Sequence, residues 1–389
     1  MPRRAPKQML FALALTTTCE LACSDTRPNW SADELEIIVS LSPVGTPPPS
    51  PGNRFADDER AAELGRRLFF DTGLSRTNAV SCATCHRPQS YFTDGRPVAF
   101  GISEGTRNTP SLLGAAWFTH GGWDGHTDSL WAQSLSALAS PAEHDISPRE
   151  VRAHVESHHR DMYVSVFGAW PSERTAMDDQ QVFVNVGKAL EAYVRHLLPG
   201  PAPFDEYVDA LRAGDPSGGG HLSLAARRGL REFLQSGCVS CHHGPLFTDD
   251  AFHNLGLPPS IGTSDLHPGR SHGARELHGS PYRCGTRFSD ATRCDELRFL
   301  DPTFSDFEGA FKTPSLRNVA QTGPYMHTGQ FESLEAVIEH YRHLPGAARV
   351  GRRDPQLRPL GRSISTHDLA AFLRTLTGSL PEERWLSPP

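Results

Sequence analysis

The sequence predicts a mainly α-helical, loop-rich protein made of two similar halves. Apolar side chains recur every three or four positions in residues 61–69, 183–197, 226–234 and 368–376, a spacing typical of helices that bury one face. No stretch alternates convincingly as a strand would, and the 34 glycines and 32 prolines among 389 residues favour long loops. Several short phrases occur twice in the same order, which indicates an internal repeat.

Composition and charge exclude several classes of protein. The 38 basic residues are outnumbered by 45 acidic ones, giving a formal net charge of −7, so nothing in the balance points to a nucleic-acid partner. Apolar residues make up 38% of the chain, enough for a core, which argues against a disordered protein. No stretch reaches the roughly 20 consecutive apolar residues of a membrane-spanning helix.

The start of the chain has the layout of a secretory signal peptide. Basic residues precede a short apolar run, residues 9–15, and the small residue Ala22 stands immediately before Cys23. We therefore expect residues 1–22 to be removed on export to the periplasm, leaving a Pro-rich leader, residues 23–54. The same stretch resembles a lipobox, so a lipid anchor at Cys23 is an alternative to an ordinary cleaved signal.

Two motifs of the form Cys-x-x-Cys-His stand out: Cys82, Cys85 and His86, and Cys238, Cys241 and His242. This order suits covalent haem attachment, because two thiols add to the two vinyl groups of one haem and the adjacent histidine falls under the iron. The rival interpretation is one zinc ion held by the two cysteine pairs. A histidine directly after each pair, together with export, argues against zinc. The motifs predict two covalently bound haem c groups with His86 and His242 as iron ligands.

Two further cysteines, Cys284 and Cys294, lie in the turn-rich stretch of residues 280–301. No histidine is positioned beside them to complete another haem motif. Because export leads to an oxidising compartment, the simplest interpretation is a disulfide that closes a surface loop.

Similar phrases follow each haem motif in the same order, which supports two copies of one haem-binding unit. The matched pairs are residues 85–94 with 241–249, 108–112 with 312–316, and 125–130 with 327–334. Residues 215–220, with three consecutive glycines, form the best boundary between the copies. We therefore predict an N-terminal haem domain over residues 55–216 and a C-terminal haem domain over residues 217–389.

Over residues 55–380 the sequence resembles the bacterial di-haem cytochrome c peroxidases and their relative MauG. The phrases that carry this resemblance are residues 68–71, 81–86, 107–112, 123–125 and 311–327. The resemblance implies two cytochrome c-like haem domains packed around a calcium ion at their junction. It also implies that the N-terminal haem reacts with hydrogen peroxide, that the C-terminal haem stores or relays electrons, and that the protein is a monomer or a homodimer.

The resemblance also bears on the open side of the first haem. Ordinary peroxidases of the family carry a histidine in the loop after the first motif, and that residue closes the haem at rest. Here no histidine occurs between His86 and His120. We therefore expect the N-terminal haem to be open and ready for peroxide, since an iron with one protein ligand can bind it. His120 and His126 remain alternatives as a second ligand.

On the second haem, the methionine ligand of the ordinary peroxidases aligns with Tyr341, and MauG has a tyrosine ligand at the equivalent place. Leu334, Val337, Ile338 and Tyr341 follow helical spacing, which places Tyr341 on the buried face of its helix. A phenolate favours ferric iron and higher oxidation states, whereas methionine favours ferrous iron. The alternative is that Tyr341 is a core side chain and the ligand is one of three other residues: Met326, His340 or His343.

The resemblance assigns four further residues to the chemistry. Trp123 falls between the two haems and would relay electrons or holes. Gln133, Pro141 and Glu143 fall on the distal face of the first haem. Glu143 would move a proton between the peroxide oxygens and so assist their cleavage. The alternative is that it is a solvated carboxylate before a turn.

The calcium site implied by the resemblance maps onto three residues that are distant in the sequence. Asn108 would bind through its side-chain oxygen, and Thr322 and Pro324 through their backbone carbonyls. Oxygen donors of this kind suit calcium. The separation of Asn108 from the other two fits an ion at the domain junction.

One departure limits the functional analogy. MauG transfers oxidising power to its protein substrate through a surface tryptophan six residues before the second haem's histidine, and here that residue is Ser236. The resemblance therefore does not imply tryptophan-tryptophylquinone synthesis on methylamine dehydrogenase. The MauG-like MbnH group, which oxidises a tryptophan of a different partner protein, stays open as the branch to which the chain belongs.

The sequence as a whole predicts an exported di-haem peroxidase of the MauG type. It would reduce hydrogen peroxide at the open N-terminal haem and use the oxidising equivalents, shared with a His/Tyr C-terminal haem, on a partner protein or donor. One alternative is a conventional di-haem cytochrome c peroxidase that takes electrons from a small redox protein. Another is a di-haem electron carrier, which would have both haems closed by two ligands.

Overall fold

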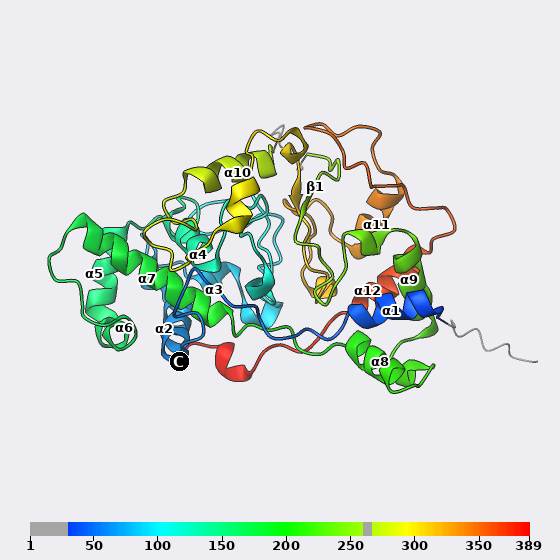
Figure 1. Ribbon diagram of the computed structural model, residues 1–389, viewed down its shortest axis with the longest axis horizontal. Coiled ribbons are helices and arrows are strands. Elements are labelled where there is room, and N and C mark those ends of the chain that lie inside the picture. Colours follow the sequence, from blue (N-terminus) through cyan, green and yellow to red (C-terminus); the bar gives the residue numbers. More distant parts are fainter. Residues whose placement is uncertain (1–29, 260–266) are drawn as a thin grey trace, which may run out of the picture.

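The computed structural model describes residues 30–259 and 267–389. Within these ranges helices joined by long loops dominate, which confirms the mainly α, loop-rich prediction (Figure 1). The described residues contain one small sheet, in which β1 (Phe252–His253) pairs antiparallel with β2 (Phe311–Lys312). None of the helices in these ranges is long and apolar enough to cross a membrane. The predicted signal peptide, residues 1–22, and Cys23 lie outside the described residues.

The first half of the molecule is built around one long buried helix. Its helices are α2 (Glu59–Phe70), α3 (Cys82–Cys85), α4 (Leu130–Ala139), α5 (Pro148–His158), α6 (Arg160–Phe167) and α7 (Ala176–Val194). Helix α7 packs against α2, α4 and α5 and is buried from Val182 to Val194. Gly65 allows α2 to approach α7, because a Cβ atom there would lie 1.9 Å from the Ala189 carbonyl oxygen.

The second half repeats this arrangement around a separate core. Its helices are α8 (Pro203–Arg212), α9 (Leu224–Gln235), α11 (Leu334–Arg342) and α12 (Thr366–Arg374). Helix α8 precedes the predicted boundary at residues 215–220, but its buried side chains belong to this second core. Helix α9 packs on α12 as α2 does on α7. Gly229 lies at this crossing, where a Cβ atom would be 1.9 Å from the Asp368 carbonyl oxygen. The four helices predicted from periodicity are therefore present, as α2, α7, α9 and α12.

The repeated sequence phrases form the same local structure in both halves. The Ser111 hydroxyl donates to the Tyr91 carbonyl at 2.7 Å, and the Ser315 hydroxyl donates to the Leu246 carbonyl at 2.7 Å. Each of these carbonyls precedes a buried phenylalanine with a left-handed backbone conformation, at Phe92 and Phe247. The two phrases thus fix the same loop after each haem motif.

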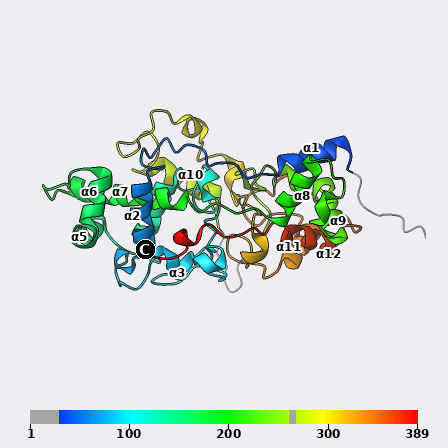
Figure 2. The ribbon, with the colours of Figure 1, turned by 90° about the horizontal axis from the view of Figure 1, so that it is seen from below.

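The two halves exchange segments from the ends of the chain. The leader contains a helix that the sequence analysis missed, α1 (Ala32–Ser40), which packs against α8 at the core of the second half (Figure 2). A capping box formed by Ser31 and Glu34 starts this helix. At the other end of the chain, Trp385 is buried in the core of the first half, where its carbonyl accepts a hydrogen bond from Tyr193.

A long excursion from the second half covers the first. It begins with α10 (Arg270–Gly279), and the predicted Cys284–Cys294 disulfide is confirmed in the loop that follows. Tyr282, in the same loop, packs against the core of the first half. Lys188 of α7 forms an ion pair with Asp290 at 2.7 Å. The disulfide therefore closes a loop that holds the two halves together.

Candidate functional site

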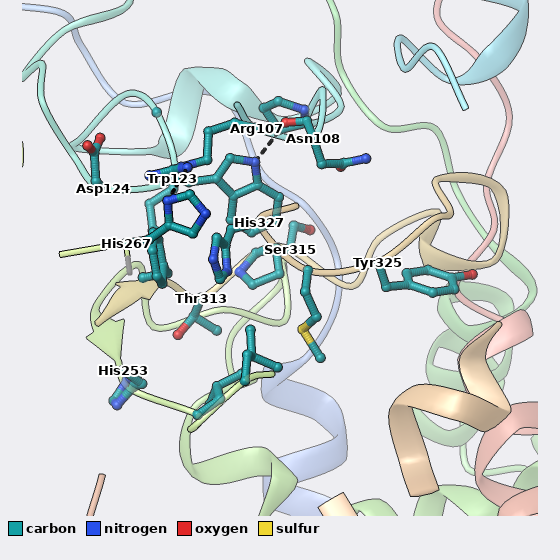
Figure 3. Close-up of a pocket in the computed structure, with 18 of the residues that line it drawn as sticks. Arg107, Asn108, Trp123, Asp124, His253, His267, Thr313, Ser315, Tyr325 and His327 are labelled. Atoms are coloured by element: carbon teal, nitrogen blue, oxygen red, sulfur yellow. Dashed lines mark hydrogen bonds between the residues drawn. The ribbon is translucent and has the colours of Figure 1, made fainter. Parts of the chain in front are cut away.

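A cavity of about 1400 Å³ lies between the two halves. Figure 3 shows its central part, where side chains from both halves converge. It is lined by most of the residues that the sequence assigned to haem attachment and ligation: Cys85, His86, Cys238, Cys241, His242 and Tyr341. The fold thus brings both haem motifs to one cavity, although they are about 150 positions apart in the sequence.

The first haem motif forms a single helical turn, α3, that aims its histidine into the cavity. The backbone amide of His86 donates to the Cys82 carbonyl at 2.9 Å and closes the turn. The Nδ1 atom of His86 lies 3.1 Å from the Phe92 carbonyl oxygen. A ring nitrogen facing a carbonyl carries the hydrogen, so Nε2 is left as the ligand atom.

The second motif reproduces this geometry. The backbone amide of His242 donates to the Cys238 carbonyl at 2.9 Å, and its Nδ1 lies 2.9 Å from the Phe247 carbonyl oxygen. Burial lowers the pKa of both motif histidines, so each imidazole is neutral, the form that binds iron. The residues present therefore fit two haem c groups, each with one oriented histidine ligand.

The loop after the first motif, which lacks a histidine, is tied by backbone hydrogen bonds to the segment that contains Glu143. The amide of Ile102 donates to the Glu143 carbonyl at 3.2 Å, and the amide of Ser103 donates to the Ala142 carbonyl at 3.1 Å. Of the two alternative histidines, His120 is absent from the cavity lining and faces Arg270 instead, with His120 Nε2 3.1 Å from Arg270 Nη2. His126 does line the cavity.

The predicted distal residues Gln133, Pro141 and Glu143 all line the cavity. Burial raises the pKa of the Glu143 carboxyl, and the hydrogen bond from Ser140 and the charge of His126 offset this only in part. The Thr127 hydroxyl donates to the Gln133 side-chain oxygen at 3.0 Å and so leaves the amide NH₂ group available. The structure thus assembles a proton-accepting carboxylate and an amide donor in the same cavity.

His126, which the sequence analysis considered only as an alternative haem ligand, makes further contacts in the cavity. Its Nδ1 lies 2.6 Å from an oxygen of Asp124, and its Nε2 lies 3.3 Å from the Ser136 hydroxyl. Burial lowers the pKa of His126, but the hydrogen bond and charge of Asp124 outweigh burial and raise it. The sequence signal was its place in the repeated phrase of residues 125–130, which by itself could not show where the ring points.

Trp123 lies where the two halves meet. Its indole Nε1 donates to the Asn108 carbonyl at 2.8 Å, and its own carbonyl accepts from the Lys312 amide of β2 at 2.9 Å. Figure 3 shows the indole next to His327 and Asn108. Trp123 lines the cavity that both motifs also line. Its place between two haems stays a prediction.

The three predicted calcium ligands, Asn108, Thr322 and Pro324, also line the cavity. The Asn108 side-chain nitrogen donates to the Arg96 carbonyl at 2.8 Å, which leaves the side-chain oxygen as a ligand atom. An amide oxygen and two backbone carbonyls form a donor set that fits calcium. Calcium binding at this junction stays a prediction.

Tyr341 lines the cavity from the core-facing side of α11, and burial raises the pKa of its phenol. Of the alternative ligands, Met326 also lines the cavity. His340 and His343 are absent from the cavity lining within the described ranges; His340 Nε2 lies 3.3 Å from the Leu255 carbonyl oxygen. The geometry leaves Tyr341 and Met326 as the candidates.

Comparison with known proteins shows that this chain is similar to di-haem peroxidases and to MauG proteins. Residues 59–212 match the family model described as di-haem cytochrome c peroxidase. The methylamine utilization protein MauG of Methylorubrum extorquens is 34% identical over 366 residues, covering 92% of this chain and 90% of that protein. Cytochrome c551 peroxidase of Pseudomonas aeruginosa is 30% identical over 326 residues, covering 83% and 80%. A solved MauG-like protein associated with microbial copper homeostasis superposes with a TM-score of 0.68 at 26% identity, covering 89% and 97%.

Proposed function

The chain belongs to the di-haem cytochrome c peroxidase and MauG family of oxidoreductases acting on hydrogen peroxide, and from this premise we propose a MauG-like role for it. In this proposal the protein is periplasmic and reduces hydrogen peroxide on its N-terminal side. The oxidising equivalents are shared with the C-terminal side and then used on a partner protein or donor. The observation that carries the proposal is Tyr341 in the cavity, combined with a first loop that lacks histidine between His86 and His120.

The haems would be held by the two motifs described above. When bound, they supply the redox chemistry, because an iron with a vacant position can react with peroxide and an iron with two protein ligands carries electrons. His86 would hold the first iron, and His242 with Tyr341 the second. The hydrogen bonds of His86 and His242 to the carbonyls of Phe92 and Phe247 orient both imidazoles for this role.

Proton movement falls to the distal residues. With its pKa raised by burial, Glu143 is a better proton acceptor than an ordinary carboxylate and can take a proton from one peroxide oxygen and return it to the other. The Gln133 amide, oriented by the Thr127 hydroxyl, can donate a hydrogen bond to a bound oxygen atom. His126, held by Asp124, adds positive charge beside Glu143 and favours the ionised carboxylate.

Trp123 would connect the two sides. An indole is readily oxidised, and this one is fixed by its hydrogen bond to Asn108 and by the backbone contact of Lys312. Its place in the cavity lining supports a relay for electrons or holes between the two haem sites. A calcium ion on Asn108, Thr322 and Pro324 would stabilise the same junction.

The test of this proposal is low-temperature electron paramagnetic resonance of the ferric holoprotein before and after one equivalent of hydrogen peroxide. We expect one high-spin and one low-spin haem signal, with both lost on addition of peroxide. Two low-spin signals that do not respond to peroxide until the protein is half-reduced would overturn the proposal.

A conventional cytochrome c peroxidase is the second candidate, favoured by the presence of Met326 in the cavity. In that role the C-terminal haem would accept electrons from a small redox protein, with methionine as its ligand. Tyr341→Phe and Met326→Leu separate the two candidates, since only replacement of the true ligand changes the low-spin signal. A change in Met326→Leu alone would support the conventional peroxidase.

A further inference from the structure

A second group of potential metal ligands lies outside the haem cavity, at the end of the first half that carries α5 and α6 (Figure 1). Asp71 follows the last residue of α2, His154 lies on α5, and His159 lies between α5 and α6. One oxygen of Asp71, Oδ2, lies 2.7 Å from the Nε2 atom of His154 and 2.7 Å from the Nε2 atom of His159. Two imidazoles thus converge on one carboxylate oxygen.

The group is held in place by its surroundings. The other oxygen of Asp71, Oδ1, accepts a hydrogen bond from the Gly73 amide at 2.8 Å, which fixes the direction of the carboxylate. A Cβ atom at Gly73 would lie 2.1 Å from the His154 ring, so the absence of a side chain there makes room for the imidazole. On its other side the His154 ring stacks on His158 with 4.4 Å between centroids.

The three side chains are sheltered but reachable. Their exposed fractions are 20% for Asp71, 16% for His154 and 14% for His159. An ion from solution could therefore reach them without unfolding of the chain, and the open side could hold water ligands. None of the three lines the haem cavity, so the group is separate from the peroxide chemistry.

We propose that Asp71, His154 and His159 form a binding site for a divalent transition-metal ion of the zinc class. Two imidazole nitrogens and one carboxylate oxygen are ligands that zinc accepts at a tetrahedral site with water in the fourth position. The hydrogen bond from Gly73 to the second carboxylate oxygen is the kind of outer contact that orients metal ligands. A bound ion would link the end of α2 to the turn between α5 and α6 and stabilise the first half.

The alternative is that both histidines only donate hydrogen bonds to Asp71, with no metal involved. The two cases predict different amounts of bound Zn²⁺ per protein and different effects of the histidine substitutions on Zn²⁺ binding. Titration calorimetry of the holoprotein with Zn²⁺ measures how many ions bind and how tightly. The buffer contains excess Ca²⁺ to fill the proposed junction site. We expect one equivalent of Zn²⁺ to bind and to raise the melting temperature, with no change in the haem absorption bands.

Single substitutions of the histidines test which side chains bind Zn²⁺. His154→Ala and His159→Ala should each weaken Zn²⁺ binding at least tenfold. The matched control is His158→Ala, which removes the exposed imidazole that stacks on His154 but takes away no ligand atom, so it should weaken Zn²⁺ binding much less than either substitution. Zinc-edge anomalous diffraction of the wild-type protein, with density at Asp71, identifies the location even if one variant folds poorly. No binding by the wild-type protein, or equal loss in His158→Ala and His159→Ala, would overturn the proposal.

Discussion

The indole Nε1 of Trp123 donates a hydrogen bond to the backbone carbonyl of Asn108 at 2.8 Å. The side chain of the same asparagine uses its nitrogen to donate to the Arg96 carbonyl and keeps its oxygen for another partner. One residue therefore fixes the proposed electron relay and offers a ligand atom to the proposed calcium site. This link predicts that calcium and the relay tryptophan respond to each other.

Asn108→Ala should separate the two roles of this residue. The substitution removes the side-chain oxygen but leaves the backbone carbonyl that accepts from Trp123. We expect calcium affinity to fall by about 10- to 100-fold, the size of effect typical when a metal-site contact is lost. Calcium titration calorimetry of the holoprotein measures the affinity, and a chelator-treated wild-type sample provides the reference state. Unchanged affinity would remove Asn108 from the calcium site.

Glu143→Gln should slow the reaction with peroxide by a factor of about 10² to 10⁴, the usual contribution of a positioned proton-transfer group. A base works only when ionised, and burial raises the pKa of Glu143. The wild-type rate should therefore rise with pH through a pKa above that of an ordinary glutamate, and the variant should lose this rise. Stopped-flow rates between pH 4 and pH 9 test both statements.

The matched control for this experiment is Glu104→Gln, because Glu104 also lines the cavity but is exposed. It should keep both the rate and the pH profile of the wild-type protein. If Glu104→Gln and Glu143→Gln had equal effects, the cavity charge and not a positioned base would control the rate.

The parts of the site that the sequence predicted are those with local signatures. The haem motifs and the Cys284–Cys294 pair are defined by short spacings. The position of Tyr341 followed from helical periodicity. The positions of α1 and Trp385 did not follow from the sequence, because an apolar pattern shows that a face is buried without showing which of two cores buries it. His126 was undervalued for a similar reason: its orientation depends on Asp124 in the same loop and on Ser136 of α4, and the sequence alone does not show how the loop lies against that helix.

A buried ion pair should control stability around the second haem motif. Arg317, with 1% of its side chain exposed, makes two hydrogen bonds to Asp205 at 2.6 and 2.9 Å and a third to the Pro245 carbonyl at 2.7 Å. Arg317→Ala leaves Asp205 buried without its partner, so the free energy of unfolding should fall by about 3–5 kcal/mol. Urea denaturation of the holoprotein measures the change. Arg374→Ala, which removes an exposed ion pair with Glu335, should change the free energy of unfolding little.

The same pair sets an expected pH dependence. Burial disfavours the ionised form of Asp205, but the hydrogen bonds and charge of Arg317 outweigh this and lower the pKa of Asp205. Because the folded-state pKa is below the unfolded-state value, the stabilisation is present above the unfolded-state pKa and is lost as pH falls through the folded-state pKa. Urea midpoints measured from pH 7 down to pH 3 should fall more steeply in the wild-type protein than in Asp205→Asn. Parallel curves would contradict this assignment.

Two equivalent glycines should affect the two haem sites separately. Gly65 and Gly229 each lie where a Cβ atom would be 1.9 Å from a carbonyl oxygen of the facing helix. An alanine at either position must push the helices apart, with an expected cost of about 1–3 kcal/mol. Helix α2 packs on α3 of the first motif, and α9 packs on the 3₁₀ turn Cys238–Ser240 of the second. Gly65→Ala should therefore alter the spectrum of the N-terminal haem and Gly229→Ala that of the C-terminal haem. Gly346→Ala, at an exposed loop position with open space around it and outside the cavity lining, should leave both spectra unchanged. A loss of both signals in either test variant would show that the halves unfold as one unit.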